Sequence, residues 1–194
     1  MCCSISASTY ETETGLSGSQ PSPLLNFSHP TMKSILLLLF LFPLFLLAQD
    51  VEPENARLGQ LDAYWAEVSR AVTTGDFAAY EATCHPDGVL VSGVKKTSSP
   101  LAEALKRWKK DFDATKGGAM KASVEFKFSK RFGDATTAHE TGIFLYSATG
   151  PDGKQTHDYI NFEALLLKRD GRWQIMMEYQ KSKATAAEFE ALTK

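Results

Sequence analysis

The chain contains little cysteine and carries almost no net charge. It has three cysteines in 194 residues, and two of them, Cys2 and Cys3, stand at its very start. Cys84 therefore has no partner for a disulfide in the rest of the chain, and we interpret it as a small buried residue rather than a nucleophile. The 21 Lys and Arg nearly balance the 23 Asp and Glu. That balance gives no electrostatic reason to expect a nucleic-acid partner.

The motifs of common cofactor and nucleophile sites are also missing. The sequence has no phosphate-binding loop, dinucleotide fingerprint, nucleophile elbow or haem-attachment motif. His85 stands near Asp87, and His157 precedes Asp158, but neither pair has a third ligand at a fixed spacing. We therefore expect neither a metal site nor a bound cofactor. Any specificity must come from a pocket or an interface.

The N-terminal fifth has a different character. Residues 1–31 are rich in Ser, Thr and Pro and contain no Lys or Arg, so we interpret them as a disordered leader that is not translated. Residues 32–48 have a short basic start at Met32, an uncharged apolar run and a small residue, Ala48, at the end, which is typical of a signal peptide. The run is shorter than the roughly 20 residues that span a bilayer. We predict a secreted or periplasmic protein without stable membrane insertion; anchoring by the same segment is the alternative.

Residues 49–194 are predicted to form one domain that begins with helices. Apolar residues recur at steps of three and four before Gly75, and they are Leu58, Leu61, Trp65, Val68 and Val72. A short helical piece over 76–82, a short strand at 89–91 and a second long helix starting at Ser99-Pro100 follow. Residues 185–192 fit a terminal helix.

Four strand-like runs fill residues 121–182. Gly133-Asp134 and Asp170-Gly171 have the spacing of two-residue hairpin loops, and residues 150–153 mark a longer turn. The sequence therefore predicts a four-stranded antiparallel meander.

A two-residue loop at Gly133-Asp134 would set the register of the first hairpin. It pairs Phe128 with His139 and Lys127 with Glu140. The buried face is then predicted to hold Val124, Phe126, Phe128, Thr141, Ile143 and Leu145. Glu140 falls on the opposite face.

A two-residue loop at Asp170-Gly171 would likewise set the register of the last hairpin. Its loop pairs Arg169 with Arg172 and Leu166 with Ile175, and continues to Ala164 with Met177 and Phe162 with Tyr179. On the reverse face Glu163 would stand opposite Glu178, an arrangement that needs a proton, a cation or a partner to relieve it.

The order of these elements resembles a known family. A long first helix, Gly75-Asp76-Phe77, a turn at His85-Pro86-Asp87, another helix and a meander that closes with residues 168–175 are similar to the nuclear-transport-factor-2-like superfamily, in its SnoaL-like and ketosteroid-isomerase-like branches. The resemblance implies an α+β fold: a curved antiparallel sheet that forms a cone (a cystatin-like roll) wrapped around N-terminal helices, with a pocket and commonly a dimer. The superfamily includes isomerases, cyclases, dehydratases, binding modules and a kinase association domain, so function must be argued from the site.

The predicted faces bring a small polar set into an aromatic pocket. His139 and Asp158 are the candidate acid and base, and Asp158 shares the parity of Ile160 and Phe162. The candidate ligand-binding residues are Tyr64, Phe126, Phe128, Thr141, Phe162 and Tyr179. Alternatively, His139 is a core histidine and Asp158 caps a loop.

Two classes of function stay open. The first is an exported, non-catalytic domain that binds a small apolar or aromatic ligand or serves as an interaction module. The second is a cofactor-free lyase or isomerase that uses His139 and Asp158. An apolar patch of Leu165, Leu167 and Met176 on the outer face also predicts a homodimer through the sheet.

Overall fold

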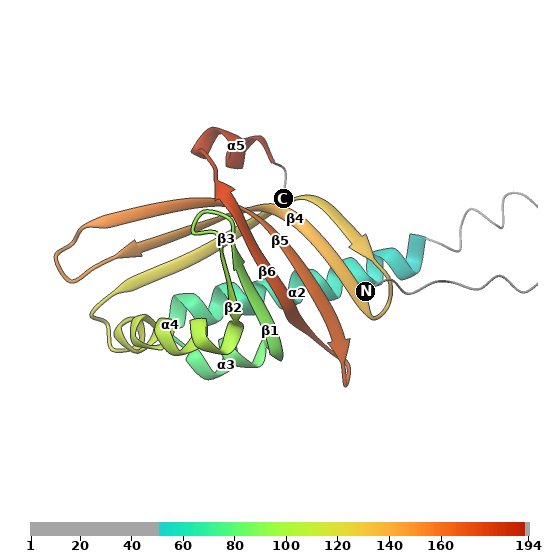
Figure 1. Ribbon diagram of the computed structural model, residues 1–194, viewed down its shortest axis with the longest axis horizontal. Helices are drawn as coiled ribbons and strands as arrows, with labels where there is room; N and C mark the ends of the chain where they lie inside the picture. Colours follow the sequence, from blue (N-terminus) through green and yellow to red (C-terminus); the bar gives the residue numbers. More distant parts are fainter. Residues whose placement is uncertain (1–50, 193–194) are drawn as a thin grey trace, which may run out of the picture. The chain divides into compact units, whose positions relative to one another are not determined.

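The computed structural model describes residues 51–192, which fold as an α+β unit with a curved sheet (Figure 1). The predicted leader at 1–31 and the signal peptide at 32–48 lie outside the described residues. The helices are α2 (Val51–Thr74), α3 (Phe77–Ala82), α4 (Leu101–Lys116) and α5 (Ala186–Ala191). The strands are β1 (Cys84–Ser92), β2 (Thr97–Pro100), β3 (Lys121–Gly133), β4 (Thr137–Thr149), β5 (Gln155–Arg169) and β6 (Arg172–Lys183).

The six strands form one unclosed sheet in the order β2-β1-β6-β5-β4-β3. The predicted antiparallel meander is confirmed as β3 to β6. The sheet as a whole is mixed, because β1 runs parallel to β6. Strands β6, β5 and β4 lie between β1 and β3 in the sheet, although only β2 and α4 separate β1 and β3 along the chain. Curvature leaves a concave face and a convex face.

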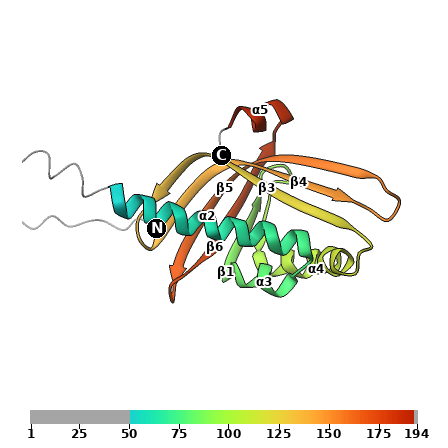
Figure 2. The ribbon, with the colours of Figure 1, turned by 180° about the vertical axis from the view of Figure 1, so that it is seen from behind.

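Helix α2 lies across the concave face (Figure 2). Its predicted apolar stripe is buried except for the partly exposed Leu58, and Leu61 is fully inaccessible to solvent. Trp65 stands in the middle of the stripe, and its ring centroid lies 4.4 Å from that of Phe126 and 5.8 Å from that of Phe162. The expected docking of this helix on the sheet is therefore confirmed. None of the helices among residues 51–192 combines the length and apolar character that crossing a membrane requires.

Helices α3 and α4 pack together beside α2, at one end of the sheet. The side chain of Asp76 caps α3 by accepting a hydrogen bond from the backbone N–H of Ala79 at 3.2 Å. The ring of Tyr80 lies 4.9 Å from that of Phe112, which is buried on α4. The second long helix was expected to start at Ser99-Pro100, but Pro100 is its capping residue and still belongs to β2, so α4 begins at Leu101.

The first hairpin has a longer loop than the sequence predicted. The Asp134 carboxylate accepts hydrogen bonds from the backbone N–H groups of Thr136 and Thr137, at 2.7 and 2.8 Å, and this holds extra residues in the turn. Pairing starts at Gly133 with Ala138, and a bulge lies between Phe128 and residue 130.

The expected pairing of Phe128 with His139 is therefore wrong, because Phe128 pairs with Gly142. An offset of three residues is odd, so it exchanges the two faces of β4 relative to β3. Ala138, Glu140, Phe144 and Tyr146 face the concave side, whereas Thr141, Ile143 and Leu145 face the convex side. Glu140, expected outside, is completely buried.

The last hairpin starts in the predicted register and then changes it. Arg169 pairs with Arg172 and Leu166 with Ile175, as expected, but Leu165 pairs with Met177. Met176 is thus the extra residue of a β-bulge. The parity of β6 is therefore reversed from Met177 to Gln180, until a second irregularity between Asn161 and Phe162 restores it.

The short helix α5 covers part of the convex face. Phe189 is almost fully buried there, with its ring 5.6 Å from that of Tyr159 and beneath the ammonium of Lys127. Lys127 forms an ion pair with Glu190 at 2.9 Å, and not the expected pair with Glu140.

Candidate functional site: an aromatic cavity on the concave face

A cavity of about 420 Å³ lies between the helices and the concave face of the sheet. Helices α2, α3 and α4 and strands β1 and β3 to β6 all contribute to its wall. The aromatic residues of the wall are Tyr64, Trp65, Tyr80, Trp108, Phe112, Phe126, Phe144, Tyr146 and Phe162. The cavity can therefore enclose a small apolar or aromatic molecule.

Three of the six predicted ligand-binding residues line this cavity: Tyr64, Phe126 and Phe162. Phe128 is not part of the wall, but it packs against Trp65 with a centroid distance of 5.6 Å and so supports the wall from behind.

The expected inward orientation of Thr141 and Tyr179 is wrong. Thr141 faces the convex side because the bulge between Phe128 and Lys130 turns the even shift of the longer loop into an odd one. Tyr179 pairs with Glu163, and not with Phe162, because the bulge at Met176 reverses the parity of β6. Neither side chain reaches the cavity.

The same bulge turns Glu178 into the cavity. Glu178 pairs with Ala164 on β5 and with Leu90 on β1, and both of these residues are buried on the concave side. Its carboxyl accepts a hydrogen bond from the side-chain amide of Gln180 at 2.7 Å. Burial raises the pKa of this carboxyl, and the hydrogen bond from Gln180 only partly opposes the rise.

The other ionisable groups of the inner wall are held neutral. Burial raises the pKa of Tyr64 and of Tyr80 well above that of a free phenol, and the Tyr64 hydroxyl donates to the carbonyl of Thr83 at 3.1 Å. Burial also raises the pKa of the Cys84 thiol to about 12. This agrees with the interpretation of Cys84 as a structural residue rather than a nucleophile.

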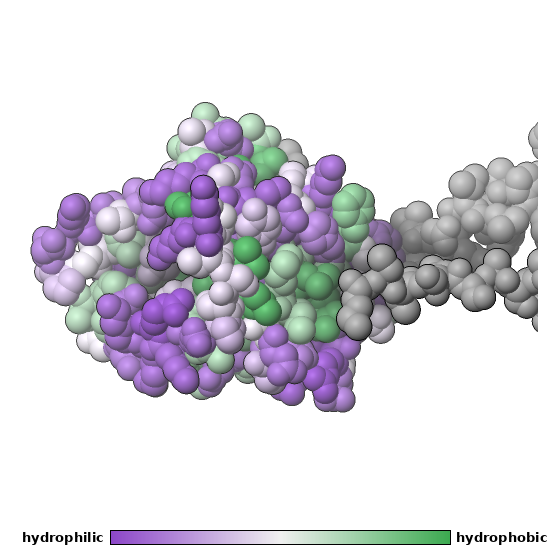
Figure 3. All heavy atoms as spheres, in the orientation of Figure 1, coloured by the Kyte–Doolittle hydropathy of each residue, from purple (hydrophilic) through white to green (hydrophobic). Residues whose placement is uncertain are grey.

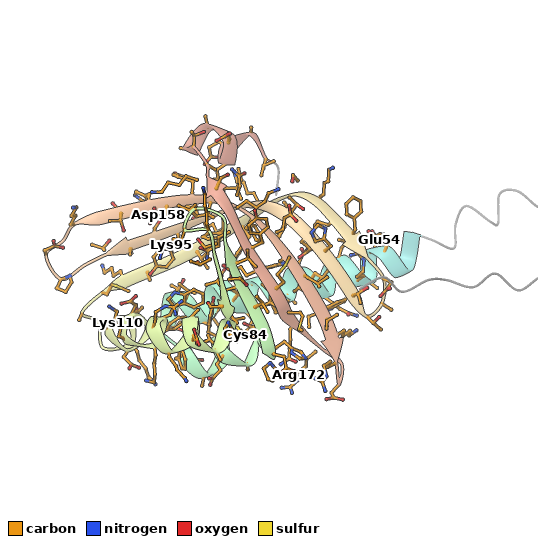
Figure 4. All side chains as sticks on the ribbon, in the orientation of Figure 1. Glu54, Cys84, Lys95, Lys110, Asp158 and Arg172 are labelled. Carbon is orange, nitrogen blue, oxygen red and sulfur yellow. The ribbon has the colours of Figure 1, made fainter. Side chains whose placement is uncertain are left out.

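Asp158 faces the cavity, as the sequence predicted. It lies at the exposed edge, where Lys183 forms an ion pair with it at 3.6 Å. Figure 4 shows Asp158 near the start of β5 in the same region as Lys95 from the turn after β1. Asp111 of α4 also belongs to the wall. The edge of the cavity is thus charged, while its interior is aromatic.

His139 lies on the opposite face of the sheet. Its Nε2 stands 3.2 Å from a carboxylate oxygen of Glu163, and Lys181 binds the other oxygen of that carboxylate at 2.6 Å. The hydrogen bond from Lys181, more than that from His139, lowers the pKa of Glu163. The sheet therefore separates His139 from Asp158, and the two cannot act on one ligand in the cavity.

A second buried carboxylate, Glu140, lies beneath α2 and has a structural environment. It accepts hydrogen bonds from the indole N–H of Trp65 and from Nε of Arg131, the latter at 2.5 Å. Arg131 also binds Asp62 of α2. This network ties the helix to β3 and β4 and leaves Glu140 outside the cavity wall.

Glu178 is the functional candidate that the sequence interpretation missed. Regular alternation from the turn placed it outside, opposite Glu163. The available signal was the run Ile175-Met176-Met177, since three consecutive apolar residues break the alternation of a strand and indicate a bulge. Within residues 51–192, no group of three or more His, Cys, Asp or Glu side chains is arranged to hold a metal ion.

Comparison with known proteins gives one family match. Residues 61–185 match the family described as calcium/calmodulin dependent protein kinase II association domain. The search of curated proteins found no match.

Several solved structures share the fold. A conserved protein from Planctomyces limnophilus is 11% identical, with a TM-score of 0.57, and the match covers 64% of this chain and 94% of that one. A ketosteroid isomerase-like protein from Erwinia carotovora is 19% identical, with a TM-score of 0.50 and coverage of 68% and 98%. An NTF-2-like protein of unknown function from Shewanella oneidensis is 17% identical, with a TM-score of 0.50 and coverage of 63% and 97%.

Proposed function

The chain belongs to the calcium/calmodulin dependent protein kinase II association domain family, and from this premise we propose that it binds a small apolar or aromatic ligand without a cofactor. Its fold is that of the nuclear-transport-factor-2-like superfamily, as the order of elements predicted. Because this fold supports several functions, the cavity carries the proposal.

The single observation behind the proposal is the aromatic lining of a cavity that opens to solvent at one edge. A cavity of about 420 Å³ falls within the size range of small-molecule sites in proteins. If these side chains served stability alone, we would expect them to fill the space, since empty apolar volume lowers stability in proportion to its size. Trp65, Phe126 and Phe162 instead pack around the space and leave it open.

A thermal-shift and calorimetric screen of steroids, polyketide-like aromatics and naphthyl compounds tests the proposal. The informative pair of variants lies on α4: Thr115 lines the cavity, and the next residue, Lys116, is exposed and outside the wall. Thr115→Trp should abolish the binding of any hit by filling the space, whereas Lys116→Trp should retain it. A hit that binds equally to both variants does not occupy the cavity, and a screen without any hit contradicts the proposal.

A cofactor-free lyase or isomerase is the second candidate function. The observation that favours it is Glu178, since a carboxyl whose pKa is raised inside a cavity is suited to general acid–base chemistry. In this form the proposal no longer uses His139. Glu178→Gln should then leave ligand binding and folding intact while turnover of the bound compound is lost.

We also propose a homodimer through the convex face. Figure 3 shows apolar side chains gathered over β5 and β6, where Leu165, Leu167 and Met176 are partly exposed. A second copy related by a two-fold axis would cover this patch with an identical one. Sedimentation velocity should give a dimer at tens of micromolar, and Leu165→Lys combined with Leu167→Glu should convert it to a monomer. A monomeric wild-type protein contradicts this interface.

We also propose that the protein is exported, because residues 32–48 have the pattern of a signal peptide. Intact-mass measurement of the natural product should give a chain that starts at Gln49. A product that retains residues 1–31 contradicts both the start at Met32 and the cleavage.

A further inference from the structure

We propose that the ligand of the cavity is an organic cation, an aromatic or apolar body that carries one protonated amine, and that its ammonium group binds the Glu178 carboxylate. This inference rests on the proposed ligand-binding function and names the chemical class of the ligand.

The first observation is that Glu178 lacks a counter-ion. Among the described residues, its carboxyl has one hydrogen bond, from the amide of Gln180. No Lys, Arg or His side chain in that part of the chain forms an ion pair with it, and no nearby cation contributes to its pKa. Glu178 is half-buried in the cavity wall, and a carboxyl that loses much of its water without gaining a cation costs free energy when it is charged. A ligand that brings a positive charge removes this cost.

The second observation is the nature of the surrounding wall. The faces of aromatic rings carry partial negative charge and attract cations, most strongly where water is excluded. Tyr80 lines the same cavity as Glu178, and burial followed by the charge of Glu178 raises the pKa of its phenol. Tyr64, Trp65 and Phe162 belong to the same wall. An ammonium group at Glu178 would thus meet aromatic rings as well as a carboxylate.

The third observation concerns the charges that face the cavity from each element. The acidic ones are Asp111 on α4, Asp158 on β5 and Glu178 on β6, and the basic ones are Lys95 after β1 and Lys183 on β6. Lys183 is already paired with Asp158. The remaining titratable wall residues are Tyr64, Tyr80, Cys84 and Tyr146, for each of which burial raises the pKa, so they stay neutral. Without Glu178 the two acids and two bases balance, so a charge on Glu178 would make the wall acidic.

Binding of an amine has a defined proton balance. In the free protein, burial raises the pKa of Glu178, which favours the protonated carboxyl. An ammonium group lowers this pKa again, so any proton on the carboxyl goes to solvent as the ammonium–carboxylate pair forms. A neutral ligand does not stabilise the carboxylate and should release no proton.

Isothermal titration calorimetry with three matched probes tests the inference: naphthylethylamine, naphthylethanol and naphthylacetate. The full chain should bind the amine at least about tenfold more tightly than the alcohol at neutral pH. Repeating the titration in two buffers with different ionisation enthalpies should reveal proton release with the amine and none with the alcohol.

Two carboxamide variants locate the effect. Glu178→Gln should remove both the preference for the amine and the proton release while it still binds the alcohol. Asp158→Asn removes a carboxylate at the exposed edge and should keep both. Because proton release is measured on the wild-type chain as well, the test does not depend on the folding of either variant.

The outcomes separate this inference from the function on which it rests. If the alcohol binds as tightly as the amine, or the acetate binds best through Lys95, the inference is overturned and the proposed cavity function stands. If the amine is preferred but Asp158→Asn removes the preference, the assignment to Glu178 is overturned. If none of the probes binds, the inference is overturned, and the proposed function fails as well only when the wider screen gives no hit.

Discussion

The replacement Glu140→Gln tests the face assignment of β4 most directly. The Glu140 side chain is completely buried, and each of its oxygens accepts one donor: the indole N–H of Trp65 and Nε of Arg131. Glutamine has nearly the same shape but offers only one acceptor oxygen. One of the two donors must then face an amide NH₂ group that cannot accept its hydrogen.

The magnitude follows from these two contacts. A hydrogen bond to a charged group contributes about 1.5–3 kcal/mol, and a buried donor left without a partner costs about 1–3 kcal/mol. Arg131 retains its ion pair with Asp62, whose side chain is 63% exposed, and this contact limits the loss. We therefore expect Glu140→Gln to lower the free energy of unfolding by about 3–5 kcal/mol.

Urea unfolding at neutral pH measures this loss, and Glu163→Gln is the matched control. Glu163 lies on the neighbouring strand but on the convex face, where Lys181 and His139 bind its carboxylate near solvent. The same substitution there should cost no more than about 1 kcal/mol. Equal losses for the two variants, or a loss below about 1 kcal/mol for Glu140→Gln, would refute the assignment of Glu140 to the interior.

Three further predictions concern single side chains. Trp65→Ala should lower the free energy of unfolding by about 3–5 kcal/mol, because it removes the ring that packs on Phe126 and Phe162; a loss below about 1 kcal/mol in a urea titration contradicts the docking of α2. Because burial raises the folded-state pKa of Glu178 above its unfolded value, the wild-type protein loses stability as pH rises between these two values. Glu178→Gln should therefore gain thermal stability relative to wild type as pH increases from about 4 to 8, and a pH-independent difference contradicts the buried carboxyl. With Cys2 and Cys3 replaced by serine, Cys84 should react with an aromatic disulfide reagent at least about a hundredfold more slowly in the native than in the denatured protein, since burial raises its pKa to about 12; similar rates would show that the thiol is accessible.

The secondary structure was largely predictable because its signals are local. The stripe of Leu61, Trp65 and Val68 marked α2, and Asp170-Gly171 set the first pairs of the last hairpin correctly. The inward positions of Phe126 and Phe162 followed from strand alternation close to these signals. The order of the elements was sufficient to identify the superfamily.

The sequence could not predict on which face of the sheet a side chain lies wherever the pairing of the strands is irregular. Side-chain hydrogen bonds of Asp134 lengthen the first loop, one bulge interrupts the first hairpin and two irregularities interrupt the last. Each irregularity shifts the register by one residue, so counting from the turn gives an odd error in the stretch that follows the first one. His139 and Tyr179 were assigned to the wrong face for this reason, and Glu178 was overlooked. These features depend on how strands fit together, which a periodicity of two does not encode.

The bulge at Met176 also changes how related sequences have to be aligned. In a relative whose last hairpin is regular, the side chain that faces the cavity next to the residue equivalent to Ala164 stands one position nearer the turn, in the column that Met177 occupies here. An alignment without a gap therefore compares an inward side chain of one protein with an outward side chain of the other. Only a gap opposite Met176 puts Glu178 in register with its structural counterparts and makes the cavity residues of different family members comparable.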